Sequence, residues 1–218
     1  MAPKIKVLGQ ENSIFNRFMS ELRDENIQQD RLRFRKNIFR CAQILAYEIS
    51  KELDYKTQSV TTPLGEADMQ LPSEEPVLVS ILRAGVPMHN GFLDFYDRAD
   101  NGFVSAYRHH TRGNEFIVKV EYLAMPQVNE RTLILVDPMI ATGKSIVLSH
   151  QAIIPAQGIP NKVIIAGIIG SEEGVDYVRR NLPQADIYIG AVDDELTAKS
   201  YIVPGLGDAG DLAFGAKE

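Results

Sequence analysis

The stretch that most constrains the fold of this chain runs from Thr132 to Ser145 and reads TLILVDPMIATGKS. It contains four consecutive apolar residues, 133–136, which predict a short strand buried on both faces. The strand ends at an acid, Asp137, and a helical apolar pattern begins after Ser145. A loop of small residues therefore joins a strand to a helix, which predicts an open α/β sheet with a ligand site at the carboxyl end of the strand.

The chemistry of this loop suits a phosphate group. Backbone N–H groups in such a loop and the positive end of the following helix dipole both attract an anion. Thr142 and Ser145 add hydroxyl donors, and Lys144 adds a cation. The alternative is an ordinary strand-to-helix turn that binds no ligand.

The spacing argues against an ATP-binding P-loop. Gly143-Lys144-Ser145 looks like the end of that motif, but the motif also needs a glycine five residues before the Gly-Lys pair. Position 138 is a proline. We therefore do not expect this loop to bind ATP in the P-loop manner.

A second strand repeats this arrangement earlier in the chain. Residues 77–82 are apolar apart from one serine and are followed by Arg83, Ala84, Gly85 and a helical pattern. An arginine at a strand end is either a surface ion-pair partner or a ligand for diphosphate. The repeated strand-loop-helix context favours the ligand interpretation.

A third strand is expected over Gly102–Arg108, followed by His109 and His110. We interpret the two histidines as a loop feature, because no third metal ligand stands at a recognisable spacing. Residues 114–122 then alternate apolar and polar side chains, which predicts a hairpin or arm over the site.

The first quarter of the chain, residues 11–54, has helical patterns, with a long helix expected over about Gln28–Leu53. Cys41 lies on the apolar face of this helix and is interpreted as a buried structural thiol. Basic residues crowd positions 31–40. A solvated face is the favoured interpretation of this cluster, and a subunit contact or effector site is the alternative. The predicted core face consists of Phe34, Ile38, Cys41, Ala42, Leu45 and Ile49.

The rest of the chain alternates strands with helices, which indicates a parallel sheet. A strand is expected over Lys56–Thr62, followed by a turn-rich stretch at Pro63–Pro76. Two further strands, near 162–169 and 186–191, flank a helix near 172–181.

The carboxyl-terminal stretch Tyr201–Gly215 reads YIVPGLGDAGDLAFG. Its glycines and its proline argue against a regular helix or a central strand. They favour a tight loop whose backbone N–H and C=O groups approach the edge of a small planar molecule. The apolar residues of this stretch need burial, which argues against a disordered tail.

Taken together, these segments resemble the uracil phosphoribosyltransferases, a family of type I phosphoribosyltransferases. The resemblance rests on VDPMIATG at 136–143, ILRAG at 81–85, the Tyr107-Arg108 pair, the 201–215 signature and the amino-terminal LRDENIQQDRLRFRKN. It implies an α/β type I phosphoribosyltransferase fold, with a central mostly parallel sheet flanked by helices. It also implies a single domain over 1–218, with a helical arm over about 11–54, a flap hairpin, and a base-binding hood over about 192–218.

The same resemblance implies transfer of the 5-phosphoribosyl group from 5-phosphoribosyl 1-diphosphate (PRPP) to uracil, giving UMP and diphosphate. Mg²⁺ would be held mainly through PRPP, without a direct protein ligand. Asp137 and Asp208 would be catalytic. PRPP would be bound by Arg83, Arg108, Asp137, Pro138, Met139, Ile140, Ala141, Thr142, Gly143, Lys144, Ser145 and Asp208. Uracil would be bound by Ile202, Gly207, Asp208 and Ala209.

Three positions depart from the family pattern. Lys144 stands where a second glycine is usual, so it would either add a cation beside the phosphate or, at positive φ, incur a steric cost. Leu212 replaces a basic residue and Ala216 replaces a threonine. Neither of these two is a proposed ligand contact.

Charge and composition narrow the remaining alternatives. A net charge of −6 gives no general attraction to nucleic acid or anionic membranes, and no apolar run reaches the length of a membrane span. A single cysteine and the absence of a secretory apolar region at the start favour the cytoplasm. The resemblance further suggests a homodimer or higher homo-oligomer and, as in some relatives, a GTP effector.

Two other functions stay open on the sequence alone. A phosphoribosyltransferase for another base would keep Arg83, Arg108 and Asp137 but alter the 201–211 loop, whose retention favours uracil. A non-catalytic nucleotide- or RNA-binding regulator could use the same fold. The acidic net charge weakens the regulator hypothesis, and the basic cluster at 31–40 keeps it open.

Overall fold

The computed structural model describes residues 3–110 and 116–216, with side chains described outside 106–119. A central sheet has the strand order β1-β10-β9-β7-β4-β5-β6, and β8 also pairs with β9. Within the described part of this sheet, neighbouring strands are parallel except for the antiparallel pair β5–β6. The sheet strands are β1 (Ile5–Val7), β4 (Val77–Leu82), β5 (Asp100–His110), β6 (Phe116–Ala124), β7 (Thr132–Val136), β8 (Met139–Ile140), β9 (Lys162–Ser171) and β10 (Asp186–Asp193).

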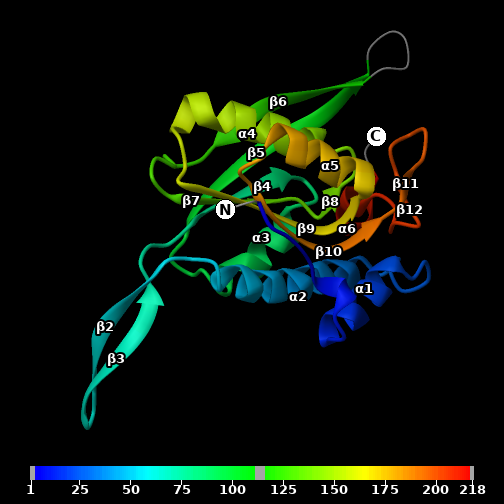
Figure 1. The fold of residues 1–218 in the computed structure, drawn as a ribbon. Coiled ribbons are helices and arrows are strands. Elements are labelled where there is room, and N and C mark those ends of the chain that lie inside the picture. Colours follow the sequence, from blue (N-terminus) through cyan, green and yellow to red (C-terminus); the bar gives the residue numbers. More distant parts are fainter. Residues whose placement is uncertain (1–2, 111–115, 217–218) are drawn as a thin grey trace.

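Helices cover both faces of this sheet (Figure 1). One face is covered by α1 (Ile14–Arg23), α2 (Arg31–Ser50) and α3 (Val86–Leu93), and the other by α4 (Lys144–Gln157) and α5 (Glu172–Asn181). A short 3₁₀ helix, Leu8–Gln10, follows β1. This arrangement confirms the predicted α/β class with a mostly parallel, helix-flanked sheet.

Strand β7 shows why the sequence pattern leads to this layering. All five of its residues are buried. Ile134 and Val136 belong to the core on the α1–α3 face, whereas Leu133 and Leu135 belong to the core on the α4–α5 face. Side chains on a strand alternate between its two faces, so an apolar run is stable only when both faces are covered.

The topology brings two strand ends together. β4 lies between β5 and β7, and it is parallel to both. The chain leaves β4 toward β5 on one side and returns to β7 on the other, and Ser80 of β4 pairs in register with Val136 of β7. The loops that follow β4 and β7 therefore lie side by side at a topological switch point, the usual ligand position in open α/β sheets.

The helical arm matches the prediction with a shorter second helix. α2 begins at Arg31 because the Asp30 side chain accepts hydrogen bonds from the backbone N–H groups of Leu32 and Arg33. All residues of the predicted core face are buried. Burial raises the pKa of the Cys41 thiol, which keeps it protonated, as expected of a structural cysteine.

Most of the basic cluster at 31–40 is exposed, as expected of a solvated face, but two of its arginines also make contacts within the chain. Arg33 forms an ion pair with Glu21 of α1 at 2.8 Å. Arg35 donates a hydrogen bond to the backbone oxygen of Ala213 at 2.7 Å. These side chains join the two arm helices to each other and to the carboxyl-terminal segment.

Two local predictions are corrected by the structure. Within the stretch predicted as turn-rich, β3 (Gly65–Pro72) pairs with β2 (Tyr55–Thr62) to form a hairpin that projects from the body (Figure 1). Its residues are mostly exposed on both faces, so no apolar alternation marked the second strand. His109 and His110 lie in β5 and pair with β6, and are not loop residues. Residues 114–115 of the predicted hairpin lie outside the described part, and 116–122 form β6 as expected.

The packing of α2 leads to a stability prediction. Leu45 is fully buried beneath the sheet, whereas Leu32 on the same helix is 61% exposed. We expect Leu45→Ala to reduce the free energy of unfolding by roughly 2–5 kcal/mol, since it leaves a cavity. Leu32→Ala should change it by less than about 0.5 kcal/mol. Urea denaturation followed by circular dichroism measures both, and equal losses would contradict this packing.

Candidate active site

The loop after β7 holds its acid in a defined orientation. Asp137 is 8% exposed, and its Oδ1 accepts a hydrogen bond from the backbone N–H of Met139 at 3.2 Å. The backbone N–H of Asp137 donates to Ala166 of β9 at 3.1 Å. After Pro138, the residues Met139 and Ile140 form β8 and pair with β9. The loop is therefore anchored to the sheet while it passes the switch point.

The tight turn into α4 needs a glycine at position 143. Gly143 has φ +70°, and a Cβ on it would lie 2.5 Å from the backbone oxygen of Gly174. Lys144 is the first residue of α4 and is exposed, and it is not among the described non-glycine residues with positive φ. The steric cost considered for Lys144 therefore does not arise, because the left-handed position belongs to Gly143.

Two residues at the start of α5, which the sequence analysis did not single out, contact the backbone of this loop. Ser171 Oγ donates to the backbone oxygen of Ala141 at 2.5 Å and accepts from the Gly174 N–H at 2.9 Å. A Cβ on Gly174 would lie 2.2 Å from the same Ala141 oxygen. A serine before a helix with an acidic first turn predicts an N-cap. The same pattern gives no sign that this serine also contacts a loop 30 residues earlier in the chain.

Arg83 follows β4 and reaches the carboxyl-terminal segment. Its Nη2 donates to Asp211 Oδ1 at 3.0 Å and to the backbone oxygen of Gly215 at 3.2 Å. Its side chain is 40% exposed. Arg108 is in β5, where its backbone position pairs with Val118, and its side chain lies outside the described part.

The carboxyl-terminal segment is partly helical, which corrects the prediction that it contains no regular helix. β11 (Glu195–Leu196) pairs with β12 (Ile202–Val203), and α6 spans Ala209–Phe214. Asp208 Oδ1 caps α6 by accepting from the N–H groups of Gly210 and Asp211 at 2.8 and 3.0 Å. Apart from one glycine, 209–214 contains no helix breaker, so a good cap is enough to start one turn.

The loop part of this segment agrees with the prediction. Gly205 and Gly207 have φ +60° and +92°, in the region that favours glycine. Ile202 and Ala209 are 4% and 1% exposed, and both lie in the same core as Ala141. With its apolar side chains turned into the core, this stretch can offer a ligand mainly its backbone groups.

The predicted PRPP loop after β7 and the predicted uracil segment contact each other. The backbone N–H of Ala209 donates to Sδ of Met139 at 3.3 Å. The structure thus brings together the loop after β7, Arg83 and the segment around Asp208, as the sequence predicted. The Arg108 side chain lies outside the described part, so its predicted place in this group stays a prediction.

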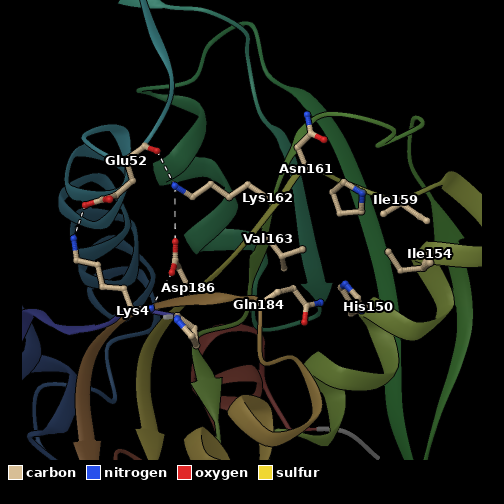
Figure 2. A pocket seen from close by; sticks show the side chains of 12 residues that line it. Lys4, Glu52, His150, Ile154, Ile159, Asn161, Lys162, Val163, Gln184 and Asp186 are labelled. Carbon is tan, nitrogen blue, oxygen red and sulfur yellow. Dashed lines mark hydrogen bonds and ion pairs between the residues drawn. The ribbon is translucent and has the colours of Figure 1, made fainter. Parts of the chain in front are cut away.

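One cavity of the protein lies far from these residues and another lies beside them. One of about 780 Å³ lies at the opposite, amino-terminal edge of the sheet, where Lys162 Nζ donates to the backbone oxygen of Glu52 at 2.8 Å and Lys4 pairs with Glu52 (Figure 2). None of the predicted site residues lines it. A second cavity of about 640 Å³ separates the arm from the carboxyl-terminal segment and is lined by Gly207 and Asp208.

Comparison with known proteins decides the family. The family model described as uracil phosphoribosyltransferase matches residues 10–216. A uracil phosphoribosyltransferase of Porphyromonas gingivalis is 49% identical over 96% of this chain and 97% of its own length. This chain belongs to the uracil phosphoribosyltransferase family. A second family member, from Thermococcus sibiricus, is 36% identical over 91% of this chain and 84% of its own length.

Solved structures agree with the fold of this uracil phosphoribosyltransferase family member. The AQ2163 protein of Aquifex aeolicus superposes with a TM-score of 0.86 at 28% identity, over 97% of this chain and 98% of that one. An adenine phosphoribosyl transferase of Trypanosoma brucei, at 12% identity and a TM-score of 0.54 over 87% of this chain and 84% of that one, shares the fold alone. The predicted family and fold are confirmed.

Family membership also makes this chain an enzyme. Uracil phosphoribosyltransferases convert uracil and PRPP to UMP in pyrimidine salvage, so the predicted reaction class is confirmed. Among the described residues, no helix is both long and apolar enough to span a membrane.

The anchoring of the loop by Ser171 gives a prediction for this uracil phosphoribosyltransferase. Ser171→Ala removes the bond to Ala141, and we expect the KM for PRPP to rise roughly tenfold, since a buried carbonyl loses its partner. The KM for uracil should change much less. Steady-state kinetics with each substrate varied in turn measures the difference.

Ser149→Ala is the matched control for this substitution. Ser149 is also fully buried, and its hydroxyl has no hydrogen-bond partner among the described residues. Its removal should leave both KM values unchanged. A Ser171→Ala enzyme that behaves like this control would show that the anchor is dispensable.

Proposed function

We propose that this chain transfers the 5-phosphoribosyl group of PRPP to uracil at the switch point of its sheet. In this proposal the loop 137–145 binds PRPP and the segment 202–209 binds uracil. The hydrogen bond from the Ala209 N–H to Met139 Sδ supports the proposal most directly, because it joins the two segments at one edge of the sheet. Reacting atoms must be held together for such a transfer.

The 5′-phosphate is assigned to the turn into α4. Backbone N–H groups over 141–145 and the hydroxyls of Thr142 and Ser145 supply donors at the positive end of the helix. Lys144 adds an exposed cation at the first helical position. The remaining loop residues assigned to PRPP, Pro138, Met139 and Ile140, lead from Asp137 to this turn, and the last two pair with β9.

The ribose is assigned to Asp137. One carboxylate oxygen is oriented by the Met139 N–H, and the carboxylate then accepts hydrogen bonds from the ribose hydroxyls. The anomeric carbon gains positive charge as diphosphate leaves, so a fixed carboxylate nearby stabilises the transition state more than the ground state.

The diphosphate is assigned to Arg83 and Arg108. Arg83 exchanges its contact with Asp211 for the diphosphate oxygens when PRPP binds, and guanidinium groups suit such oxygens. When bound, Mg²⁺ supplies positive charge to the departing diphosphate. Among the described residues, no group of three or more His, Cys, Asp or Glu side chains is placed to bind a metal.

Uracil is assigned to backbone groups of Ile202, Gly207 and Ala209. Their side chains are buried or absent, so backbone groups are left to read the edge of a flat pyrimidine; the Ala209 N–H would give up its weak bond to Met139 Sδ for the base. Asp208 lies between them and is placed near both the base and the ribose; only its Oδ1 is used in capping α6. The β5–β6 hairpin excludes water, which would otherwise hydrolyse PRPP.

The finer expectations about assembly and regulation are also part of the proposal. The whole chain, 1–218, folds as a single domain. It acts as one subunit of a homodimer or higher homo-oligomer in the cytoplasm, and GTP is a candidate effector. Exposed apolar side chains on the projecting hairpin, Leu64 and Met69, support an assembly in which this hairpin is covered.

The reaction itself is tested with a panel of bases. Purified protein is incubated with PRPP, Mg²⁺ and, in turn, uracil, cytosine, adenine and hypoxanthine, and the nucleotide formed is measured. We expect UMP from uracil, little product from the other bases, and loss of turnover with EDTA. Equal turnover with another base would contradict the uracil assignment, and binding of UMP without its formation would favour the non-catalytic regulator.

The role of Asp137 is tested by Asp137→Asn, which keeps the shape and removes the charge. We expect kcat to fall by about 10²-fold or more, with an unchanged circular dichroism spectrum. Asp176→Asn, at an exposed site on α5, is the control and should keep full activity. Wild-type kinetics in the Asp137→Asn enzyme would remove this carboxylate from the reaction.

A further inference from the structure

A charged network joins the helical arm to the carboxyl-terminal segment away from the reacting groups. Arg23, the last residue of α1, forms a two-pronged ion pair with Asp193 at the end of β10, with both N–O distances 2.7 Å. Arg23 Nη1 also donates to the backbone oxygen of Gly205 at 3.0 Å. Asp193 Oδ2 accepts from the Gly205 N–H at 2.8 Å. Both backbone groups of Gly205 are therefore bound by the pair.

Gly205 lies between two of the proposed uracil contacts, Ile202 and Gly207. It has φ +60°, and a Cβ on it would lie 2.0 Å from the backbone oxygen of Ile202. The peptide is thus folded back closely on Ile202. Any rotation of the Gly205 peptide would carry over to the backbone groups on either side.

The acid of this network is buried and the arginine is partly buried. Asp193 is 8% exposed and the Arg23 side chain 28%. Burial raises the pKa of Asp193, but the bonds from Arg23 and Gly205 outweigh it and hold this pKa below its usual value. Asp193 therefore stays charged at neutral pH, and its two oxygens match the fork of the guanidinium.

We propose that Arg23 and Asp193 are positioning residues of the uracil site. They act through Gly205, by fixing the backbone between Ile202 and Gly207, and do not touch the reacting atoms. The proposal rests on the proposed binding of uracil by segment 202–209. It gives the amino-terminal arm a role in base recognition that is separate from its role in the core.

Arg23→Ala tests this role, with KM values for both substrates as the readout. We expect the KM for uracil to rise roughly tenfold or more, since the Gly205 backbone oxygen and the buried Asp193 carboxylate both lose their partner. The KM for PRPP should change less than about twofold, because the loop after β7 is anchored separately by Ser171. Arg23→Lys keeps the charge without the fork and should restore uracil binding only in part.

The chain offers a control in Arg131, which makes the same kinds of contact, although its partner Asp100 is 56% exposed and Asp193 is 8% exposed. Its Nη1 pairs with Asp100 at 2.6 Å, its Nη2 donates to the backbone oxygen of Glu75 at 3.1 Å, and its side chain is 27% exposed. This pair lies at the amino-terminal edge of the sheet, far from the segment 202–209. Arg131→Ala should leave both KM values unchanged.

The outcomes separate this proposal from the assigned reaction. UMP formation by the wild-type protein tests the reaction alone. Given an active wild type, an unchanged uracil KM in Arg23→Ala, or an equal rise in both KM values, overturns the positioning role. If Arg23→Ala does not fold, Asp193→Asn replaces it, since asparagine keeps the volume and one oxygen for Gly205. A selective rise in the uracil KM of that variant supports the proposal, and unchanged kinetics overturn it.

Discussion

The structure depends on the close parallel pairing of β4 and β7 in the middle of the sheet. Both strands are buried, and their register brings the residues that follow them, Arg83 and Asp137, to one edge. Burial on both faces leaves the carboxyl ends of these strands as the place where polar groups meet solvent. The loop after β7 and the loop after β4 are adjacent for this reason, although Arg83 and Asp137 lie 54 positions apart in the sequence.

Each half of the site is held by residues from a different part of the chain. Ser171 and Gly174, at the start of α5, support the loop after β7. Arg23 and Asp193 support the carboxyl-terminal turn through Gly205. Ligand-facing loops carry few contacts of their own, and these supports limit the conformations that the loops can adopt before a ligand arrives.

Much of this arrangement could be predicted from sequence because it is local. The apolar run of β7, the glycine at 143 and the turn-forming residues at 204–207 each determine their own backbone. The contacts of Ser171 and Arg23 could not be predicted, because no pattern in the sequence around either residue indicates which distant residue it binds. The β2–β3 hairpin was missed because both of its faces are exposed, and α6 because the Asp208 cap outweighed the glycine that follows Ala209.

The contact between the halves differs in kind from the supports behind them. A thioether sulfur is a weak acceptor on a flexible side chain, so the bond from Ala209 to Met139 tolerates small changes of distance and angle. The charge-assisted bonds around Gly205 tolerate much less. The two segments are thus each held by strong hydrogen bonds and joined to each other by a weak one, so the distance between them can change without breaking the bonds that support either segment.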